Sequence, residues 1–396
     1  MTFNKKSVPL LMIFMFSLFL FCLPVFGGQK LVNNLFHASL VLLIGSAIIY
    51  RKSICQEVIK NKDYQSFKNG MIFISIFLLY FSLSGLWSEE PLNISSEISH
   101  SLYIIAFIII FKIASERLSR VQIYSILAVS ITLLCILTLY FADKNRIFSS
   151  RLNRSFVWAP SNVIDLGGYF AIGILLISMI IRDTGKKWLY FPALVLFAGL
   201  LLTQSRNPLF SLILVSLPLL LSFKKINRYN VKVILPILVA ISAVVIFMYY
   251  NSSLFSRIGQ SYHSSFVRFG IWQNAFDLFL QKPVFGWGFD KNLNFINSLK
   301  QHITTTHSLY FAVLLKGGIV GMITFLLMIG YSLKVAISAL RKGYALECSL
   351  FIFSLLFYAT QGMFVIGNPD ISWILFWLPI AIIYSTLPQG INNRLN

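Results

Sequence analysis

The feature that most constrains this chain is a series of apolar runs that are long enough, or nearly so, to cross a lipid bilayer. A transmembrane helix needs about 20 consecutive apolar residues, and about twelve such runs can be counted in the 396 residues. They lie at residues 8–26, 33–50, 70–87, 101–115, 122–141, 165–181, 188–203, 208–222, 232–250, 308–332, 347–366 and 372–388. The sequence therefore predicts an all-α polytopic membrane protein with about twelve transmembrane helices.

The first run resembles a secretory signal peptide because it follows Lys5 and Lys6. It is longer than such peptides usually are, however, and no small-x-small cleavage site follows it. Eleven further runs come after it. We therefore interpret it as a retained first helix.

The distribution of charge predicts how the chain is oriented. Alternate connections between the runs differ in basicity, and the more basic set holds 21 of the 33 lysines and arginines but only 5 of the 13 acids. Basic residues are enriched in cytoplasmic connections. The basic set, which includes both termini, is therefore predicted to be cytoplasmic, and most of the net charge of +20 reflects topology rather than nucleic-acid binding.

Twelve basic residues remain on the opposite side, where this rule predicts few. They are Lys30, Lys144, Arg146, Arg151, Arg154, Arg206, Arg257, Arg268, Lys282, Lys291, Lys300 and Lys316. Membrane insertion does not explain them, so we consider an anionic ligand on the outer face. The alternative is contact with lipid headgroups and solvent.

Arg206 stands out among these residues because of its position. It lies in "LLLTQSRNPLFSLILV", where one predicted helix must reverse into the next within about four residues. Gln204, Ser205 and Asn207 supply turn-forming side chains and hydrogen-bond donors, and Pro208 suits the first position of the returning helix. A guanidinium at this surface matches phosphate oxygens, although it can instead reach lipid headgroups.

The longest segment between runs, residues 251–307, is large enough to hold its own structure. It contains "SSFVRFGIWQNAFDLFLQKPVFGWGFDKN", in which apolar residues recur at helical spacing over 265–281. We expect an amphipathic helix on the bilayer surface, stopped by Pro283, with Arg268 near its positive end. The predicted organisation is one membrane domain: helices over 1–250, this periplasmic loop over 251–307, and helices over 308–396.

Two of the five histidines lie in "QHITTTHSLYFAVLLKGGIVGM", residues 301–322. We predict that His307 lies in the first turn of the next helix, with Thr304, Thr305 and Thr306 available to cap it and to bind sugar hydroxyls. His302 is interpreted as an exposed loop residue or a donor to sugar hydroxyls. The glycines that follow allow close helix packing.

A second outer connection carries its own cluster of basic and aromatic residues. It reads "DKNRIFSSRLNRSFVWAPSN" over residues 143–162 and includes Arg151 and Arg154. Such a segment suits contact with the sugars or phosphates of a glycan. We treat Arg151 and Arg154 as candidate substrate-binding residues.

Together these motifs resemble the O-antigen ligase and polymerase family of bacterial surface-polysaccharide assembly. The matching stretches are "LTQSR", "VRFGIWQNAFDLFLQKPVFGWGFD" and "HSLYFAVLLKGGIVGMITF", which fall in order between residues 200 and 330. The resemblance implies a metal-independent glycosyltransferase in the bacterial inner membrane that needs no cofactor. Its donor would be an undecaprenyl-diphosphate-linked glycan, and its active site would face the periplasm.

The resemblance also assigns roles to individual residues. It places the diphosphate-binding arginines at Arg206 and Arg268 and the essential histidine at His307. Members of the family commonly have Asn where this chain has Ser308, and often an acid near Lys316. These departures concern the acceptor side of the site.

Elementary chemistry supports the same roles for the two arginines and the histidine. Two fixed guanidiniums can stabilise the charge that develops on a diphosphate leaving group. A neutral histidine can take the proton of an attacking sugar hydroxyl. A base other than His307, such as His302, is less consistent with the family position.

Several alternatives stay open from the sequence. The acceptor distinguishes a ligase, which uses lipid A-core oligosaccharide, from a polymerase, which uses another lipid-linked repeat. A polysaccharide or lipid transporter is a third possibility, although no half-to-half repeat is evident. Glu89, Glu90 and Glu97 can in principle hold a divalent metal, but without a clustered histidine or an Asp-x-Asp motif they do not make a convincing site, and helix capping is simpler.

Overall fold

The computed structural model describes residues 7–59, 64–88, 94–144, 151–152, 155–221, 252–297 and 299–385. This part of the chain is mostly helical, and its one sheet is a ribbon of two short strands. The helices before the long outer segment are α1 (Ser7–Phe26), α2 (Lys30–Ile59), α3 (Tyr64–Ser84), α4 (Ile94–Arg117), α5 (Arg120–Phe141), α6 (Val163–Thr184), α7 (Tyr190–Leu202) and α8 (Arg206–Leu221). They are followed by α10 (Ser252–Gln281), β1 (Phe295–Ile296), β2 (His302–Ile303), α11 (Leu309–Arg341), α12 (Ala345–Tyr358) and α13 (Leu378–Ser385).

The prediction of a helical membrane protein is confirmed in its general form. Six helices are long and apolar enough to cross a membrane, and four shorter apolar helices accompany them in the described residues. Large apolar side chains remain exposed on their outer surfaces, such as Ile48 (77%) and Phe191 (73%). Lipid is the solvent that suits such a surface. The predicted run at 232–250 lies outside the described residues, and the count of about twelve spans stays a prediction.

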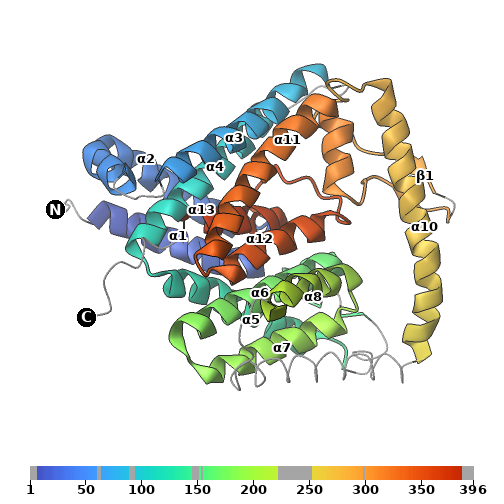
Figure 1. Ribbon diagram of the computed structural model, residues 1–396, viewed down its shortest axis with the longest axis horizontal. Helices are drawn as coiled ribbons and strands as arrows, with labels where there is room; N and C mark the ends of the chain where they lie inside the picture. Colours follow the sequence, from blue (N-terminus) through green and yellow to red (C-terminus); the bar gives the residue numbers. More distant parts are fainter. Residues whose placement is uncertain are drawn as a thin grey trace.

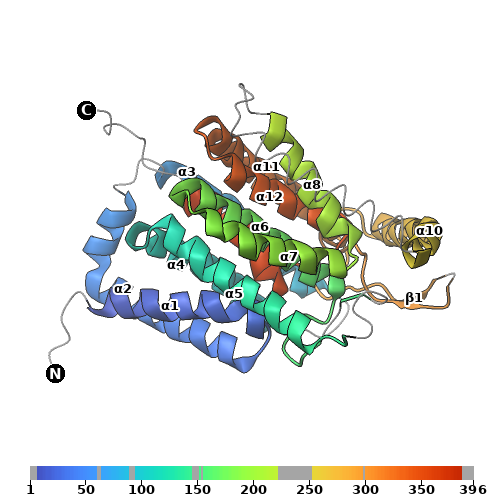
Figure 2. The same cartoon turned by 90° about the horizontal axis from the view of Figure 1, so that it is seen from below.

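The helices pack side by side, and one helix lies across their end. In Figure 1, α10 runs roughly at right angles to the bundle at its margin, and in Figure 2 it is seen nearly end-on beside α8. Aromatic side chains fill the bundle interior, where Phe19, Phe36 and Phe107 surround the Trp373 ring at centroid distances of 4.9 to 6.0 Å. The bundle thus provides a rigid base for the connections at its ends.

The predicted amphipathic helix corresponds to α10, which is longer than expected. Some of its apolar residues are buried against the protein, and others are exposed on its outer side. Ile271, Ala275 and Phe279 are buried, and the first two belong to a small core shared with the following loop and the start of α11. Phe269 and Phe276 are instead 62% and 44% exposed on the outer side. This outer set is free to contact lipid.

The prediction that Arg268 lies near the start of this helix is wrong. Because α10 begins at Ser252, Arg268 lies in its middle, more than four turns from the positive end. The helix dipole acts within about one turn of a helix end. Any attraction of Arg268 for an anion must therefore come from its own charge and its neighbours.

Two helices near the C-terminus also differ from expectation. The run predicted at 347–366 is helical only to Tyr358, and a loop over residues 359–371 follows it. Polar residues together with Gly362, Gly367 and Pro369 disfavour helix there. A π-helical segment, η3 (Trp373–Trp377), then leads into α13.

Helix α11 is broken at Gly318, which has φ +61°. Residues 283–288 pack into the break, where Ile319 donates to the Pro283 carbonyl at 2.8 Å and Trp287 donates to the Leu315 carbonyl at 3.0 Å. Gly317 lies against the Phe81 ring of α3, as close packing requires. The glycines of this motif therefore serve both packing, as predicted, and a helix break that the sequence did not reveal.

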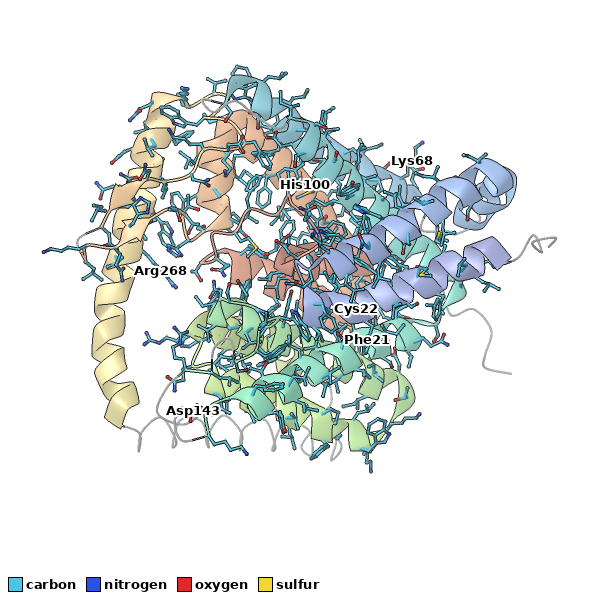
Figure 3. The ribbon with its side chains drawn as sticks, turned by 180° about the vertical axis from the view of Figure 1, so that it is seen from behind. Phe21, Cys22, Lys68, His100, Asp143 and Arg268 are labelled. Carbon is cyan, nitrogen blue, oxygen red and sulfur yellow. The ribbon has the colours of Figure 1, made fainter. Side chains whose placement is uncertain are left out.

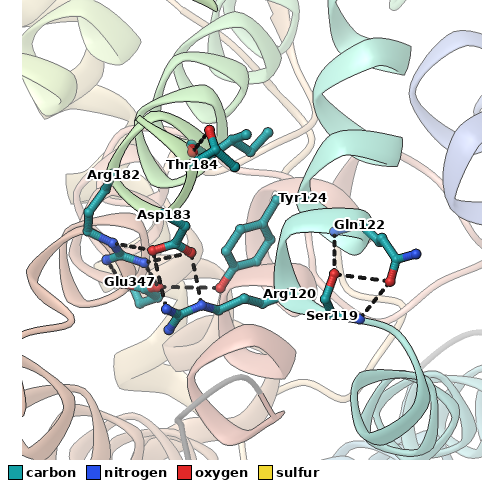
Figure 4. A network of polar contacts seen from close by, with 9 residues as sticks. Ser119, Arg120, Gln122, Tyr124, Arg182, Asp183, Thr184 and Glu347 are labelled. Atoms are coloured by element: carbon teal, nitrogen blue, oxygen red, sulfur yellow. Dashed lines mark hydrogen bonds and ion pairs between the residues drawn. The ribbon is translucent and has the colours of Figure 1, made fainter. Parts of the chain in front are cut away.

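At the other end of the bundle, three connections meet in a network of ion pairs (Figure 4). Arg182 at the end of α6 makes two hydrogen bonds of 2.7 Å to the Glu347 carboxylate of α12. Asp183 accepts from Arg182 and from Arg120 at the start of α5, each at 2.9 Å. These are connections that the charge rule assigns to the cytoplasm.

This network predicts a large effect on stability. Glu347 is almost fully buried, and Glu347→Ala leaves the Arg182 guanidinium with Asp183 as its remaining carboxylate partner. We expect a loss of about 2–4 kcal/mol in the free energy of unfolding, below the ~3–5 kcal/mol of fully buried pairs because Arg182 is 27% exposed. Unfolding in mixed detergent micelles measures it. Asp277→Ala, which removes an exposed carboxylate on α10, is the control and should change stability by less than about 0.5 kcal/mol.

Candidate functional site

The site begins with the turn between α7 and α8, which is held from two sides. Ser205 donates to the Val163 carbonyl at the start of α6 (3.1 Å), and Asn207 donates to the Phe357 carbonyl of α12 (2.8 Å). Gln204 adopts φ +50°, a conformation that is uncommon outside glycine. Arg206, the first residue of α8, projects from this fixed turn and is exposed. Pro208 was predicted to be the first residue of this helix, but it is the third, because α8 begins at Arg206.

Helix α6 has small residues where it supports this turn. A side chain at Gly167 would collide with Pro208 and Thr203, so only glycine allows the approach. Asp165 lies two residues before Gly167 on the same helix. Its buried carboxylate accepts a hydrogen bond from the side-chain amide of Gln361, in the loop after α12. The start of α6 thus joins the α7–α8 turn to the loop after α12.

Arg151 comes from the connection before α6 and lies against the same turn. Its Nε donates to the Thr203 carbonyl at 3.2 Å and its Nη2 to the Ser205 hydroxyl at 3.1 Å. Leu152 adds a backbone bond to Leu202 at 2.8 Å. These contacts give Arg151 a positioning role for the turn. Arg154, the other candidate of this segment, lies outside the described residues.

Arg268 reaches the site from α10, on the long helix at the margin of the molecule (Figure 3). Its side chain is partly buried. Burial lowers the pKa of its guanidinium, and the positive charge of Arg206 lowers it further. The two cations therefore lie close enough to repel each other, and an anion between them would remove that repulsion.

His307 lies just before α11 rather than in its first turn, which corrects the prediction. The helix begins at Leu309, and Ser308 is its N-cap residue. The Thr306 hydroxyl donates to the Ser308 carbonyl at 2.6 Å, while Thr304 and Thr305 are exposed. His307 has φ +49°, a strained conformation for a residue with a side chain. Such strain persists only where the surroundings hold it.

The surroundings of His307 include a glycine that the sequence did not single out. Gly362, in the loop after α12, lies directly against the His307 backbone, and a methyl group there would be 2.7 Å from the His307 Cα. No spacing or motif in the sequence links the two residues, which are far apart in the chain. Only the fold brings Gly362 behind His307.

The electrostatics of His307 favour its neutral form. Burial lowers the pKa of its imidazole below the usual 6.5, and the charge of Arg268 lowers it further. No described residue forms a hydrogen bond with the ring. A neutral, unbonded imidazole beside a cation is able to accept a proton from a ligand.

His302, the other candidate histidine, lies outside this group of coupled charges. It is in β2, is exposed, and makes a 2.7 Å hydrogen bond to Asn294. The strand pairs with β1 through Ile296. The structure thus places His302 on the exposed ribbon, as the sequence predicted for a loop residue.

Three of the outer lysines have structural partners. Lys282 and Lys291 both lie 4.1 Å from the centre of the Trp287 ring. Lys316 is buried, donates to the Phe289 carbonyl, and faces Asp290 and the buried Glu97. Its charge therefore interacts with the loop that packs against α11. It does not lie on the outer surface where an anionic ligand was considered from the sequence.

Glu97 is also not part of a cluster of acids in the described residues. Its carboxyl group lies beside that of Asp290 from the loop after α10. Glu89 and Glu90, its predicted companions, lie outside the described residues. Among the side chains that the structure describes, no group of three or more His, Cys, Asp or Glu is arranged to hold a metal ion.

Comparisons with known proteins find one matching family and one relative. A model of the O-antigen ligase family matches residues 191–326. An O-antigen ligase of Pseudomonas aeruginosa is 25% identical over 204 residues, which cover 49% of this chain and 46% of that protein. The match thus spans about half the length of this curated relative. The matched segment, residues 191–326, holds Arg206, Arg268 and His307, and over this segment the chain is similar to the O-antigen ligase family.

Proposed function

We propose that this protein is an O-antigen ligase that transfers a glycan from undecaprenyl diphosphate to a hydroxyl of lipid A-core oligosaccharide. The transfer would take place at the periplasmic face of the inner membrane. One observation carries the proposal: the charge of Arg206 acts on Arg268, and the charge of Arg268 acts on His307. These residues come from three separate segments, and in this proposal they form one site of two cations and one imidazole.

The arginines suit the leaving group of such a transfer. The bond between the anomeric carbon and the diphosphate oxygen breaks, and negative charge develops on the lipid diphosphate. Two guanidiniums that are already positioned stabilise this charge without having to reorganise. Because they repel each other in the free protein, binding of the diphosphate also relieves an unfavourable interaction.

The histidine suits the acceptor. A new bond forms between the acceptor oxygen and the anomeric carbon, and the hydroxyl proton passes to a ring nitrogen of His307. The cation that lowers the pKa of His307 keeps the ring neutral before this step. Arg151 and Gln204 are positioning residues of the Arg206 turn in this scheme.

A polymerase breaks the same bond and differs only in its acceptor. A deletion strain of the source bacterium separates the two functions. If this chain is the ligase, long glycan accumulates on the undecaprenyl carrier. Single repeats on lipid A-core would instead identify it as the polymerase, and unchanged chain lengths in both pools would exclude both.

A transporter is the alternative of another class, and the break in α11 is the feature that favours it. The break is filled, however, by the backbone of residues 283–288, which hydrogen-bonds across it. An unwound segment that serves transport lines a cavity. The packing therefore supports a structural role for the break.

Gly362→Ala tests whether the strained backbone of His307 matters for catalysis. The added methyl group cannot fit behind His307 without displacing it. We expect kcat to fall by about 10²-fold, because small displacements of a reacting group have effects of this size, while donor binding is kept. Gly330→Ala is the matched control, since nothing lies within 4 Å of its added methyl group. Equal activity of the two variants would show that the position of His307 is not critical.

The pH dependence of transfer should report His307. Because the pKa of His307 is lowered, the protein stays active as the pH falls to below 6.5 and loses activity only when the ring protonates. Arg268→Gln removes one cause of the lowering, so its acidic limb should shift to higher pH. Arg268→Lys keeps the charge and should leave the limb in place. Profiles of kcat/KM against pH for the three proteins test this, and identical limbs would contradict it.

A further inference from the structure

A pocket lies where α6 meets the α1–α2 turn. It has a volume of about 230 Å³ and is walled by the α1–α2 turn, residues 157–161, α6 and the end of the loop after α12. Its polar and aromatic lining includes Gln29, Trp158, Ser161, Tyr169 and Asp370. Among the residues that the structure describes, no lysine or arginine lines it. The pocket therefore suits a neutral polar group rather than a phosphate.

Tyr169 gives the strongest indication that the pocket is built for a ligand. Its side chain is only 1% exposed, and its hydroxyl is buried without a hydrogen-bond partner in the described structure. A methyl group at Gly27 would lie 3.9 Å from this hydroxyl, which places it at the pocket wall. Buried hydroxyls normally have partners, so a hydrogen-bonding ligand would satisfy this one.

Asp370 and Trp158 are the other pocket residues that a ligand could contact. One carboxylate oxygen of Asp370 accepts from the Ser372 amide at 2.9 Å and from its hydroxyl at 2.8 Å, which fixes the group in place. No described residue donates to the other oxygen. Trp158 is 49% exposed and packs on Phe26, with ring centres 5.0 Å apart. A carboxylate, a phenol and an indole face are groups that bind a sugar ring.

We propose that this pocket is a subsite for a neutral sugar of the acceptor glycan. The proposal rests on the ligase function, since it takes the acceptor to be an oligosaccharide. Its volume is below the ~300–1,000 Å³ of pockets for drug-sized ligands and limits it to about one sugar ring. The donor is already held through its diphosphate, whereas the acceptor needs its own recognition.

The pocket is connected to the transfer site through α6. Val163 contacts Ser205, next to Arg206, and Tyr169 lies six residues further along the same helix. At 1.5 Å per residue this is about 9 Å along the helix axis. The loop after α12 makes a second connection, because it carries Gly362 behind His307 and Asp370 in the pocket. The pocket and the transfer site are therefore both bordered by α6 and by the loop after α12.

Tyr169→Phe is the sharpest test, since it removes only the unpartnered hydroxyl. If that hydroxyl has no ligand, its loss leaves the protein equally stable or more so and changes no kinetic constant. We expect the KM for the acceptor to rise at least fivefold, with kcat and the KM for the donor unchanged. Tyr190→Phe, an exposed tyrosine at the start of α7, is the matched control. A rise in the KM for the donor alone would assign the pocket to the donor glycan and overturn the proposal.

A binding measurement separates this proposal from the proposed function. The probe is core oligosaccharide released from the lipopolysaccharide of the source bacterium by mild acid. It is titrated against full-length His307→Ala protein in nanodiscs, with and without Tyr169→Phe. A dissociation constant at least fivefold weaker in the double variant supports the subsite, even if the wild type transfers no glycan. Equal affinities, with transfer by the wild type intact, refute the subsite alone.

Discussion

His307→Ala is expected to reduce glycan transfer by about 10²–10⁴-fold, the range that a general base contributes. The imidazole lies half-buried beside Arg268, with its pKa lowered and no hydrogen bond from the described residues. Alanine removes the group that takes the proton but leaves both arginines. Donor binding should therefore survive. Single-turnover transfer from a lipid-linked donor, measured beside donor affinity, checks both expectations.

Two controls make this result specific to proton transfer. Because the His307 ring forms no hydrogen bond with the described part of the protein, its loss should lower thermal stability little. His302→Ala removes an exposed imidazole of the same loop that bonds to Asn294, and it should keep most of the activity. Wild-type rates in the His307→Ala protein, or equal losses in the two variants, would remove His307 as the base.

Arg206→Ala and Arg268→Ala should each reduce kcat/KM for the donor by about 10²–10³-fold, as the loss of one stabilising donor does at comparable sites. The affinity for the lipid diphosphate should fall in parallel. Lysine at either position should restore activity only in part, because it keeps the charge but loses the planar fork. Arg341→Ala, an exposed arginine at the end of α11, is the control.

The loss of a binding arginine should affect the stability of the protein differently from the loss of a structural arginine. The charge of Arg206 repels Arg268 in the free protein, so removing the Arg268 charge should leave stability unchanged or slightly raise it. A structural arginine such as Arg182 would show the opposite, because its loss leaves Glu347 unpaired. If Arg268→Ala destabilises the protein as Glu347→Ala does, the role of Arg268 in binding the diphosphate is not supported.

The sequence by itself determined the class of the protein and the ends of many helices. Apolar runs of membrane length indicate helices because lipid leaves the backbone no other hydrogen-bond partner. The turn at Arg206 and the amphipathic helix around Arg268 were also predictable, since both depend on residues close in the chain. The family match over residues 191–326 then confirmed the resemblance that these motifs carried.

The tertiary structure alone decided what surrounds these residues. Gly362 lies behind His307, Arg151 braces the turn of Arg206, and Lys316 is buried among Phe289 and Asp290. Each contact joins segments that are far apart in the chain, so no local pattern of polarity or spacing encodes it. The longer course of α10 likewise moved Arg268 away from the helix end. Local sequence fixes which groups are present, whereas long-range packing sets the distances between them and hence their protonation and their chemistry.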